Sequence, residues 1–195
     1  MFKESRSIIE PCHLSQVHLL QDVAIRTYQE TFSDSNSEAL LQQYYKESLS
    51  IEKLSAQLQN NRSEFYFIYT TSDASEGTSE DISETAPKNT EAKLAGFLKL
   101  NVDDAQTDIF DTEALEVEKI YILKDFLAQG LGKKLISFAV DRAIKQNKKY
   151  LWLGVWEHNF PALRFYQKMG FEQFGEHDFN MGGDIQKDLL LKRVL

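Results

Sequence analysis

Residues 125–135, "DFLAQGLGKKL", place Gly130 and Gly132 two positions apart, directly before two lysines and a run of apolar residues at helical spacing. The preceding stretch "ALEVEKIYIL" (114–123) has the pattern of a strand. A strand that runs into a glycine turn and a helix leaves unpaired N–H groups at the positive end of the helix dipole. Glycines there let a phosphate approach the backbone, because no Cβ stands in the way. The stretch predicts either a plain strand-to-helix turn or a phosphate cradle, and its spacing fits neither a Walker loop nor the three-glycine dinucleotide motif.

Strand and helix patterns alternate on both sides of this turn. The expected strands are 64–71, 93–102, 114–123, 150–156, 171–180 and 185–195. The expected helices are a first with Leu14, Val17, Gln21, Ala24 and Tyr28 on one face, a second with Leu40, Leu41, Tyr44 and Tyr45, a third that Ser50 caps, a fourth after the glycine turn with Leu135, Phe138, Ala139 and the aliphatic stem of Arg142 buried, and a fifth at 160–169. This order predicts an α/β fold with a strand–helix–strand crossover in the middle.

The length of 195 residues, 42% of them hydrophobic, suits one buried core, so we expect a single domain over 1–195. Residues 72–91 are rich in Ser, Thr and Glu, and they predict a long, mobile acidic loop between the strands at 64–71 and 93–102. Six acids against Lys88 give this segment −5 of the net charge of −8. The overall charge therefore says little about an active site.

The charge and hydropathy patterns also bear on partners and location. A net charge of −8 argues against nucleic acid, because binding to the phosphate backbone depends on clustered Lys and Arg. No stretch of roughly 18 or more apolar residues occurs, and "MFKESRSIIEPCHL" turns polar too early for a signal peptide. We expect a cytoplasmic protein with no membrane partner, and the lone Cys12 agrees with a reducing compartment. The sequence leaves room for a homodimer.

A second motif lies downstream in "ALRFYQKMGF" (162–171). Together with the glycine turn it resembles the GNAT superfamily of N-acetyltransferases, whose signature is Q/R-x-x-G-x-G/A followed by A-x-x-F-Y-x-K-x-G-F. Leu127 stands where that signature has Gln or Arg, which weakens the match without removing a site built mostly from main-chain groups. Within the superfamily the chain is similar to the PaiA-type bacterial branch of spermidine/spermine acetyltransferases, through the blocks "GFLKLN", "EVEKIYILK", "LWLGVWEHN", "FYQKMGF" and "HDFNMGGDIQKDLLLK".

This resemblance implies a mixed, mostly antiparallel twisted sheet with a splayed central pair of parallel strands and flanking helices. It implies an acyltransferase that uses acetyl-coenzyme A as acyl donor and moves the acetyl group directly to a primary amine of a small molecule, polyamines such as spermidine or spermine being favoured. The residues implied to bind acetyl-coenzyme A are Ile120, Tyr121, Ile122, Ala128, Gln129, Gly130, Leu131, Gly132, Lys133, Asn159, Tyr166 and Lys168.

The resemblance also implies an acid and a base. Tyr166 would act as the acid and give its proton to the departing sulfur. The alternative for Tyr166 is a purely structural role as an aromatic residue of the core. The acceptor also needs a base, because a primary amine with a pKa near 10.4 is neutral in only roughly one molecule in a few thousand at pH 7. Glu116 and Glu118 alternate onto one face of their strand. Glu116 is the first candidate for the base, because it stands at the position where the superfamily places one. Glu118 is the second candidate. The alternative for both carboxylates is solvation, or pairing with Lys119 or Lys124.

The sequence allows more than one role for several of the residues around the predicted site. Asn159 is expected to bond the pantetheine amide or to cap the helix that begins at Phe160. Trp156 is expected in the core or in the wall of the acceptor pocket. The four histidines show no zinc spacing, so we assign no metal. The alternatives to a small-molecule acetyltransferase are a protein or peptide amine acetyltransferase and a non-catalytic acyl-coenzyme A-binding regulatory module.

Overall fold

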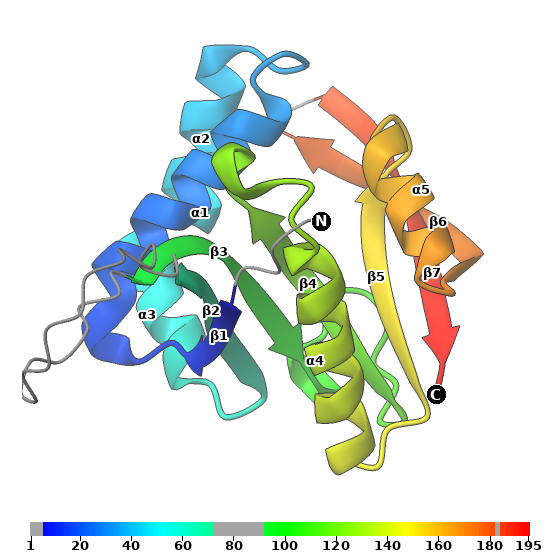
Figure 1. Cartoon of the computed structure of the whole chain (residues 1–195). Coiled ribbons are helices and arrows are strands. Elements are labelled where there is room, and N and C mark those ends of the chain that lie inside the picture. The colour runs from blue at the N-terminus through cyan, green and yellow to red at the C-terminus, as the bar shows by residue number, and fades with distance from the viewer. Residues whose placement is uncertain (1–5, 72–91, 182–183) are drawn as a thin grey trace, which may run out of the picture.

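Seven strands form one mixed sheet in the order β1-β2-β3-β4-β5-β7-β6 (Figure 1). The computed structural model describes residues 6–71, 92–181 and 184–195. The strands are β1 (Arg6–Pro11), β2 (Ser63–Thr71), β3 (Ala92–Asn101), β4 (Ala114–Ile122), β5 (Tyr150–Trp156), β6 (Glu172–Met181) and β7 (Asp184–Val194). They confirm the six predicted strands and add β1, which the sequence analysis missed. The predicted loop at 72–91 lies outside the described residues, but β2 and β3 pair as an antiparallel hairpin, with Thr71 opposite Ala92.

The pairing of β4 with β5 is the one parallel pairing in the described sheet, and it is short. Only Ala114–Glu116 of β4 pair with Tyr150–Trp152 of β5, whereas both strands continue beyond these residues. A parallel pair needs a crossover connection, and the helix α4 (Leu131–Lys145) supplies it. From Val117 onward the two strands diverge, which confirms the expected mixed sheet with a splayed central pair.

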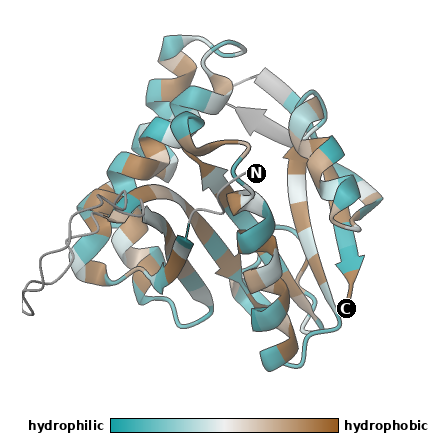
Figure 2. Cartoon of the chain, in the orientation of Figure 1, coloured by the Kyte–Doolittle hydropathy of each residue, from teal (hydrophilic) through white to brown (hydrophobic). Residues whose placement is uncertain are grey.

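Helices cover both faces of the sheet (Figure 1). The helices α4 and α5 (Phe160–Lys168) lie on one face, where the larger apolar core includes Leu135, Ala139 and Leu151. The helices α1 (Val17–Phe32), α2 (Glu38–Ser48) and α3 (Ile51–Gln59) enclose a second core with β2, β3 and the end of β4. Figure 2 shows alternating hydrophilic and hydrophobic bands along the helices, as expected for amphipathic helices that cover a sheet. Three 3₁₀ turns complete the described elements: η1 (Leu14–Gln16), η2 (Asp103–Ala105) and η3 (Lys124–Phe126).

Two helix faces differ in detail from the prediction. In α4 the buried residues are Leu131, Leu135, Ile136, Ala139 and Ala143. Phe138 and Arg142 lie at the border of this face: the ring of Phe138 packs edge-on against Tyr66, and the guanidinium of Arg142 binds Glu64 of β2. Arg142 is therefore turned toward a carboxylate of β2, and the buried stripe of α4 instead follows positions 131, 135, 139 and 143, four residues apart.

The first helix begins later than predicted. Leu14 belongs to η1 and is 43% exposed, so it is not part of the buried face. Gln21 lies at the edge of that face, and its side-chain amide donates to the carbonyl of Leu49 at 2.8 Å. The predicted cap of α3 is confirmed, because the hydroxyl of Ser50 accepts the N–H of Lys53 at 3.3 Å. Within the described ranges, none of the helices combines the length and the apolar composition needed to cross a bilayer.

Candidate active site

The glycine turn opens α4 without a side-chain cap. Ala128 and Gly130 have positive φ angles of 60° and 76°, and Gly130 occupies the N-cap position in the left-handed region. A Cβ at Gly130 would meet nothing within 4 Å, so the space in front of the turn is open. The first N–H of the helix that bonds back is that of Lys134, which donates to the carbonyl of Gly130 at 3.1 Å. The preceding N–H groups of the first turn are thus available for an anion.

The second glycine has a different role from the one the sequence suggested. A Cβ at Gly132 would lie 3.3 Å from Cζ of Phe165 in α5, so the missing side chain lets α4 and α5 pack closely. Leu131 is 1% exposed, which leaves only its backbone N–H for a ligand. The other predicted residues of the turn, Ala128, Gln129 and Lys133, are exposed.

Ile120, Tyr121 and Ile122 lie on the part of β4 that has left β5. On their other side they pair with Leu98, Phe97 and Gly96 of β3, so the edge that faces β5 carries no strand partner among the described residues. A strand edge of this kind presents backbone donors and acceptors to an extended ligand. The predicted pantetheine contacts therefore lie along an open edge that leads from Glu116 to the glycine turn.

Tyr166 lies on the buried side of α5, in the larger apolar core. Its side chain is 8% exposed and packs against the rings of Phe165 and Phe171 at centroid distances of 5.3 and 5.7 Å. Burial raises the pKa of the Tyr166 phenol, so the group keeps its proton at neutral pH. Burial also raises the pKa of Tyr121, and the nearby phenols of Tyr44 and Tyr166 add to that effect.

Glu116 is the last residue of β4 that pairs with β5, and its side chain is buried. Its Oε2 accepts Nδ2–H of Asn101 at 2.9 Å and the backbone N–H of Thr107 at 3.0 Å, and its Oε1 accepts the hydroxyl of Thr107. Burial raises the pKa of Glu116 to about 7, although these hydrogen bonds favour the charged form. A carboxyl group with this pKa can accept a proton near neutral pH.

Glu118 lies two positions further along β4 in a different electrostatic environment. Its carboxylate is paired with the ammonium groups of Lys99 and Lys119, the latter at 3.0 Å, and it accepts Nδ2–H of Asn101 at 2.6 Å. Burial opposes its ionisation, but Lys119 and Lys99 outweigh burial and lower the pKa of Glu118 to about 2. The expected pairing with Lys119 is confirmed for Glu118.

The prediction that both carboxylates share one face is confirmed, because the single amide of Asn101 reaches both of them. The register of β3 and β4 shifts here: Leu100 pairs with Val117 and Lys99 with Lys119, so Glu118 is the extra residue of a β-bulge. At this bulge the ammonium group of Lys119 lies 3.0 Å from the carboxylate of its neighbour Glu118. The roles of Asn101, Thr107 and Lys99 were not predicted, although Asn101 and Lys99 lie in the block "GFLKLN".

Two of the remaining predicted residues, Asn159 and Trp156, lie at the end of β5. Asn159 caps α5, since its Oδ1 accepts the N–H of Ala162 at 3.2 Å, which confirms one of its two expected roles. Lys168 is exposed at the far end of α5. Trp156 is partly buried, with its ring 6.3 Å from that of Phe32, whereas Trp152 belongs to the core.

Two carboxylates, those of Asp108 and Asp188, lie near His177 at the end of β5. Nδ1 of His177 in β6 is 2.8 Å from Oδ2 of Asp108, and Nε2 is 4.0 Å from Oδ2 of Asp188 in β7. Burial raises the pKa of Asp188, and His177 opposes this effect. A Cβ at Gly154 of β5 would lie 3.6 Å from Oδ2 of Asp188, so the absent side chain keeps the space beside this carboxylate open.

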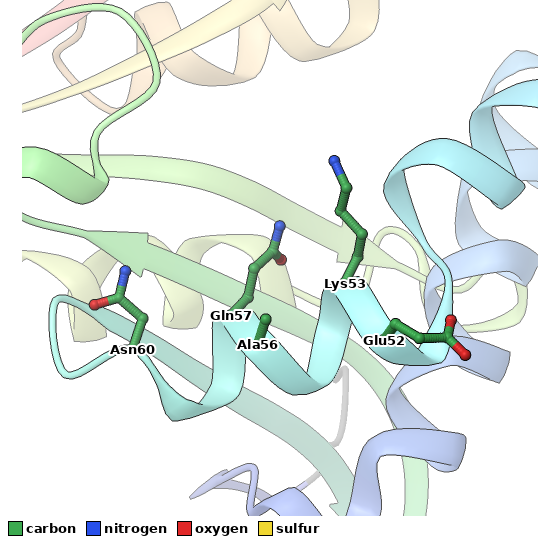
Figure 3. A pocket seen from close by; sticks show the side chains of 5 residues that line it. All are labelled: Glu52, Lys53, Ala56, Gln57 and Asn60. Carbon is green, nitrogen blue, oxygen red and sulfur yellow. The ribbon is translucent and has the colours of Figure 1, made fainter.

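Figure 3 shows a shallow depression elsewhere, on the exposed side of α3. It is lined by Glu52, Lys53, Ala56, Gln57 and Asn60, and it contains none of the predicted site residues. Nor do the described residues contain a group of three or more His, Cys, Asp or Glu side chains arranged to hold a metal ion.

Comparisons with known proteins agree with this geometry. A family model described as the acetyltransferase (GNAT) family matches residues 30–171. A protein of Lactobacillus delbrueckii subsp. lactis, named an uncharacterized N-acetyltransferase in the pepI 3′ region, is 36% identical over 184 residues, which cover 93% of this chain and 95% of that protein. The spermine/spermidine N(1)-acetyltransferase of Bacillus subtilis (strain 168) is 29% identical over 100 residues, 51% of this chain and 66% of that protein.

A solved structure shares the fold over nearly the whole chain. The PaiA N-acetyltransferase of Thermoplasma acidophilum, determined in complex with coenzyme A, matches with a TM-score of 0.68 and 20% identity, over 97% of this chain and 99% of that one. At this level of identity the likeness concerns the arrangement of strands and helices.

Proposed function

Because the chain belongs to the acetyltransferase (GNAT) family, we propose that it moves the acetyl group of acetyl-coenzyme A directly to a primary amine of a small molecule, with the polyamines spermidine and spermine as the favoured acceptors. The observation that carries this proposal is the free edge that β4 presents beyond its last pair with β5, together with three features of the elements around it. These are the open turn at Gly130, the buried phenol of Tyr166 and the buried carboxyl group of Glu116.

The glycine turn and the free strand edge fit the two ends of coenzyme A. The N–H groups of the first turn of α4, at the positive end of the helix dipole, suit the pyrophosphate. The free edge of β4 at Ile120–Ile122 suits the amides of the pantetheine arm, with Asn159 on the opposite strand end. A main-chain N–H of this edge would then stabilise the negative charge that develops on the thioester oxygen.

The chemistry assigns a role to each titratable group. The neutral amine attacks the thioester carbonyl carbon, the carbon–sulfur bond breaks, and Tyr166 donates its proton to the departing thiolate. Glu116, with a pKa of about 7, receives the proton that the acceptor ammonium has to lose. Glu118 is a poorer base, because its ion pairs with Lys99 and Lys119 stabilise the carboxylate and lower its affinity for a proton.

The preference for a polyamine rests on charge and on one relative. Asp188 and Asp108 place carboxylates near the splay, where the second ammonium group of a polyamine would be stabilised. The Bacillus subtilis relative carries spermine and spermidine in its name, although it matches only about half of this chain. These two points favour polyamines over amines without a second positive charge.

The test is a thiol-release assay with acetyl-coenzyme A and a panel of acceptors. The panel contains spermidine, spermine, a monoamine of similar length and a peptide with a free N-terminus, and the acceptors are compared by kcat/KM. The proposal predicts thiol release with a clear preference for the polyamines. Preference for the peptide would favour a protein or peptide acetyltransferase, and binding of acetyl-coenzyme A without release for any amine would favour a regulatory binding module.

A further inference from the structure

The proposed base cannot receive a proton from the acceptor directly. The Glu116 side chain is 2% exposed, and three donors from the described residues surround it. Asn101 and the backbone of Thr107 contribute amide N–H groups, and the third donor is the hydroxyl of Thr107. A proton that leaves an ammonium group must therefore pass through one of these donors.

Only one of the three donors can both give and accept a proton. Amide N–H groups lack a lone pair for an incoming proton, whereas a hydroxyl has one donor hydrogen and two acceptor lone pairs. An ionised carboxylate only accepts, so the hydroxyl of Thr107 has to donate to Oε1 of Glu116. Its remaining lone pairs are then free to accept. Thr107 is also exposed, whereas Glu116 is buried behind it.

The loop between β3 and β4 holds Thr107 in this place. The neighbouring Gln106 is 3% exposed; its Oε1 accepts the indole N–H of Trp152 at 2.7 Å, and its Nε2 donates to the carbonyl of Asp111 at 2.9 Å. On the other side of Thr107, Asp108 is 2.8 Å from His177. Thr107 thus stands between an anchor in the core and the acidic side chains beside the splay.

We propose that the hydroxyl of Thr107 relays the proton of the acceptor ammonium to Glu116. In this step the ammonium N–H bond breaks and the proton moves to Oγ1 of Thr107, either directly or through one water molecule. At the same time the hydroxyl proton of Thr107 moves to Oε1 of Glu116. The products are a neutral amine, an intact threonine and a neutral carboxylic acid, so charge and atoms balance.

The charged groups around Glu116 are compatible with this step. Glu118 of β4 and Lys99 of β3 face it with opposite charges, Lys119 neutralises Glu118 further, and Trp152 of β5 is uncharged. The relay rests on the proposed role of Glu116 as base, so its test has to separate the two.

The experiment measures kcat for acetyl-coenzyme A and spermidine between pH 6 and the pKa of the acceptor amine, about 10.4. Thr107→Val keeps the shape and the backbone N–H but removes the hydroxyl, and it is expected to lower kcat near pH 7.5 by about 10²-fold. The loss should shrink as the pH approaches the pKa of the amine, because free amine then needs no base. Thr107→Ser restores a hydroxyl and should recover most of the rate.

A matched control and a double variant separate the relay from other roles. Thr112→Val changes an exposed threonine of the same loop, whose carbonyl accepts from Lys148, and it should leave kcat unchanged. Glu116→Gln should show the same pH profile as Thr107→Val, and the double variant should be no slower than either single variant. Multiplied losses in the double variant, or a Thr107→Val loss that does not depend on pH, would overturn the relay.

Other outcomes distinguish the relay from its premise. If Glu116→Gln keeps the rate and profile of the unmodified protein, Glu116 is not the base and the relay is overturned with it, whereas thiol release by the unmodified protein still supports the acetyltransferase. If Glu116→Gln is impaired and Thr107→Val is not, only the relay is wrong. A proton inventory on the unmodified protein covers the case in which Thr107→Val does not fold: two protons in flight predict a curved dependence of rate on the deuterium fraction, and a linear one contradicts the relay.

Discussion

Replacing Glu116 by glutamine removes a buried group that titrates near neutral pH, and this should change how stability depends on pH. Burial raises the pKa of Glu116 from 4.5 to about 7. Each unit of difference between the folded and unfolded states corresponds to about 1.4 kcal/mol, so the full effect is about 3 kcal/mol. The side chain is 2% exposed, so solvent screening does not reduce this value much.

The sign follows from the number of protons bound. Between pH 4.5 and pH 7 the unfolded chain has lost the proton of Glu116, whereas the folded chain still holds it. The free energy of unfolding therefore falls as the pH rises through this window, by about 1.4 kcal/mol per pH unit, and levels off above it. Glu118 acts in a different window: its pKa is lowered to about 2, so its stabilising contribution is present above pH 4.5 and is lost as the pH falls toward 2.

The assay is urea unfolding of the unmodified protein and of Glu116→Gln at closely spaced pH values from 4.5 to 8. Subtracting the two curves cancels the other titrating groups, and the difference should change by about 3 kcal/mol across this range. Glu172→Gln, at an exposed position of β6, is the control and should give a flat difference. A flat difference for Glu116→Gln as well would show that the carboxyl group does not titrate near neutrality, and the argument for it as base would fail.

Three further substitutions test the cofactor side of the site. Tyr166→Phe should lower kcat by about 10²-fold or more while the Kd for coenzyme A, measured by calorimetry, changes little, because only the proton of the phenol is lost; equal losses in both would contradict its role as acid. Gly130→Ala should lower stability by about 1 kcal/mol, seen as a lower Tm, because a side chain is strained at φ 76° even though the space is open; an unchanged Tm would refute this. Asn159→Ala should cost about 1 kcal/mol by uncapping α5, and a weaker affinity for coenzyme A beyond that loss would indicate a direct contact as well.

The elements around the site could be predicted because their sequences carry local signals. The glycine turn, the alternation in β4 and the serine that caps α3 are each readable within a few residues. By contrast, β1 was missed: "RSIIEP" is a six-residue edge strand with one partner, and its side chains are exposed or only partly buried. An edge strand of this kind needs no apolar alternation, so no pattern announces it.

The candidate site was predictable in its carboxylates but not in their acidity. The spacing of Glu116 and Glu118 places them on one face, yet the sequence does not show that one of them is buried under Thr107 and the other is paired with two lysines. These contacts depend on a bulge in the strand register and on an irregular loop. Neither the bulge nor the loop has a periodic residue pattern, so neither can be predicted from the sequence.

The short parallel ladder ends at Glu116, so the free edge of β4 begins directly beyond this residue. The pairing of β4 with β5 ends at Glu116 and Trp152, and the same point begins the free edge that suits pantetheine. Trp152 is fully buried, and its indole N–H anchors Gln106, which places Thr107 over Glu116. One residue pair thus both ends the ladder and anchors the loop, whereas a ladder that continued to Ile120–Ile122 would pair the free edge of β4 and close it to a ligand. The divergence of the two strands therefore leaves an open edge for the pantetheine arm directly next to Glu116, the proposed base.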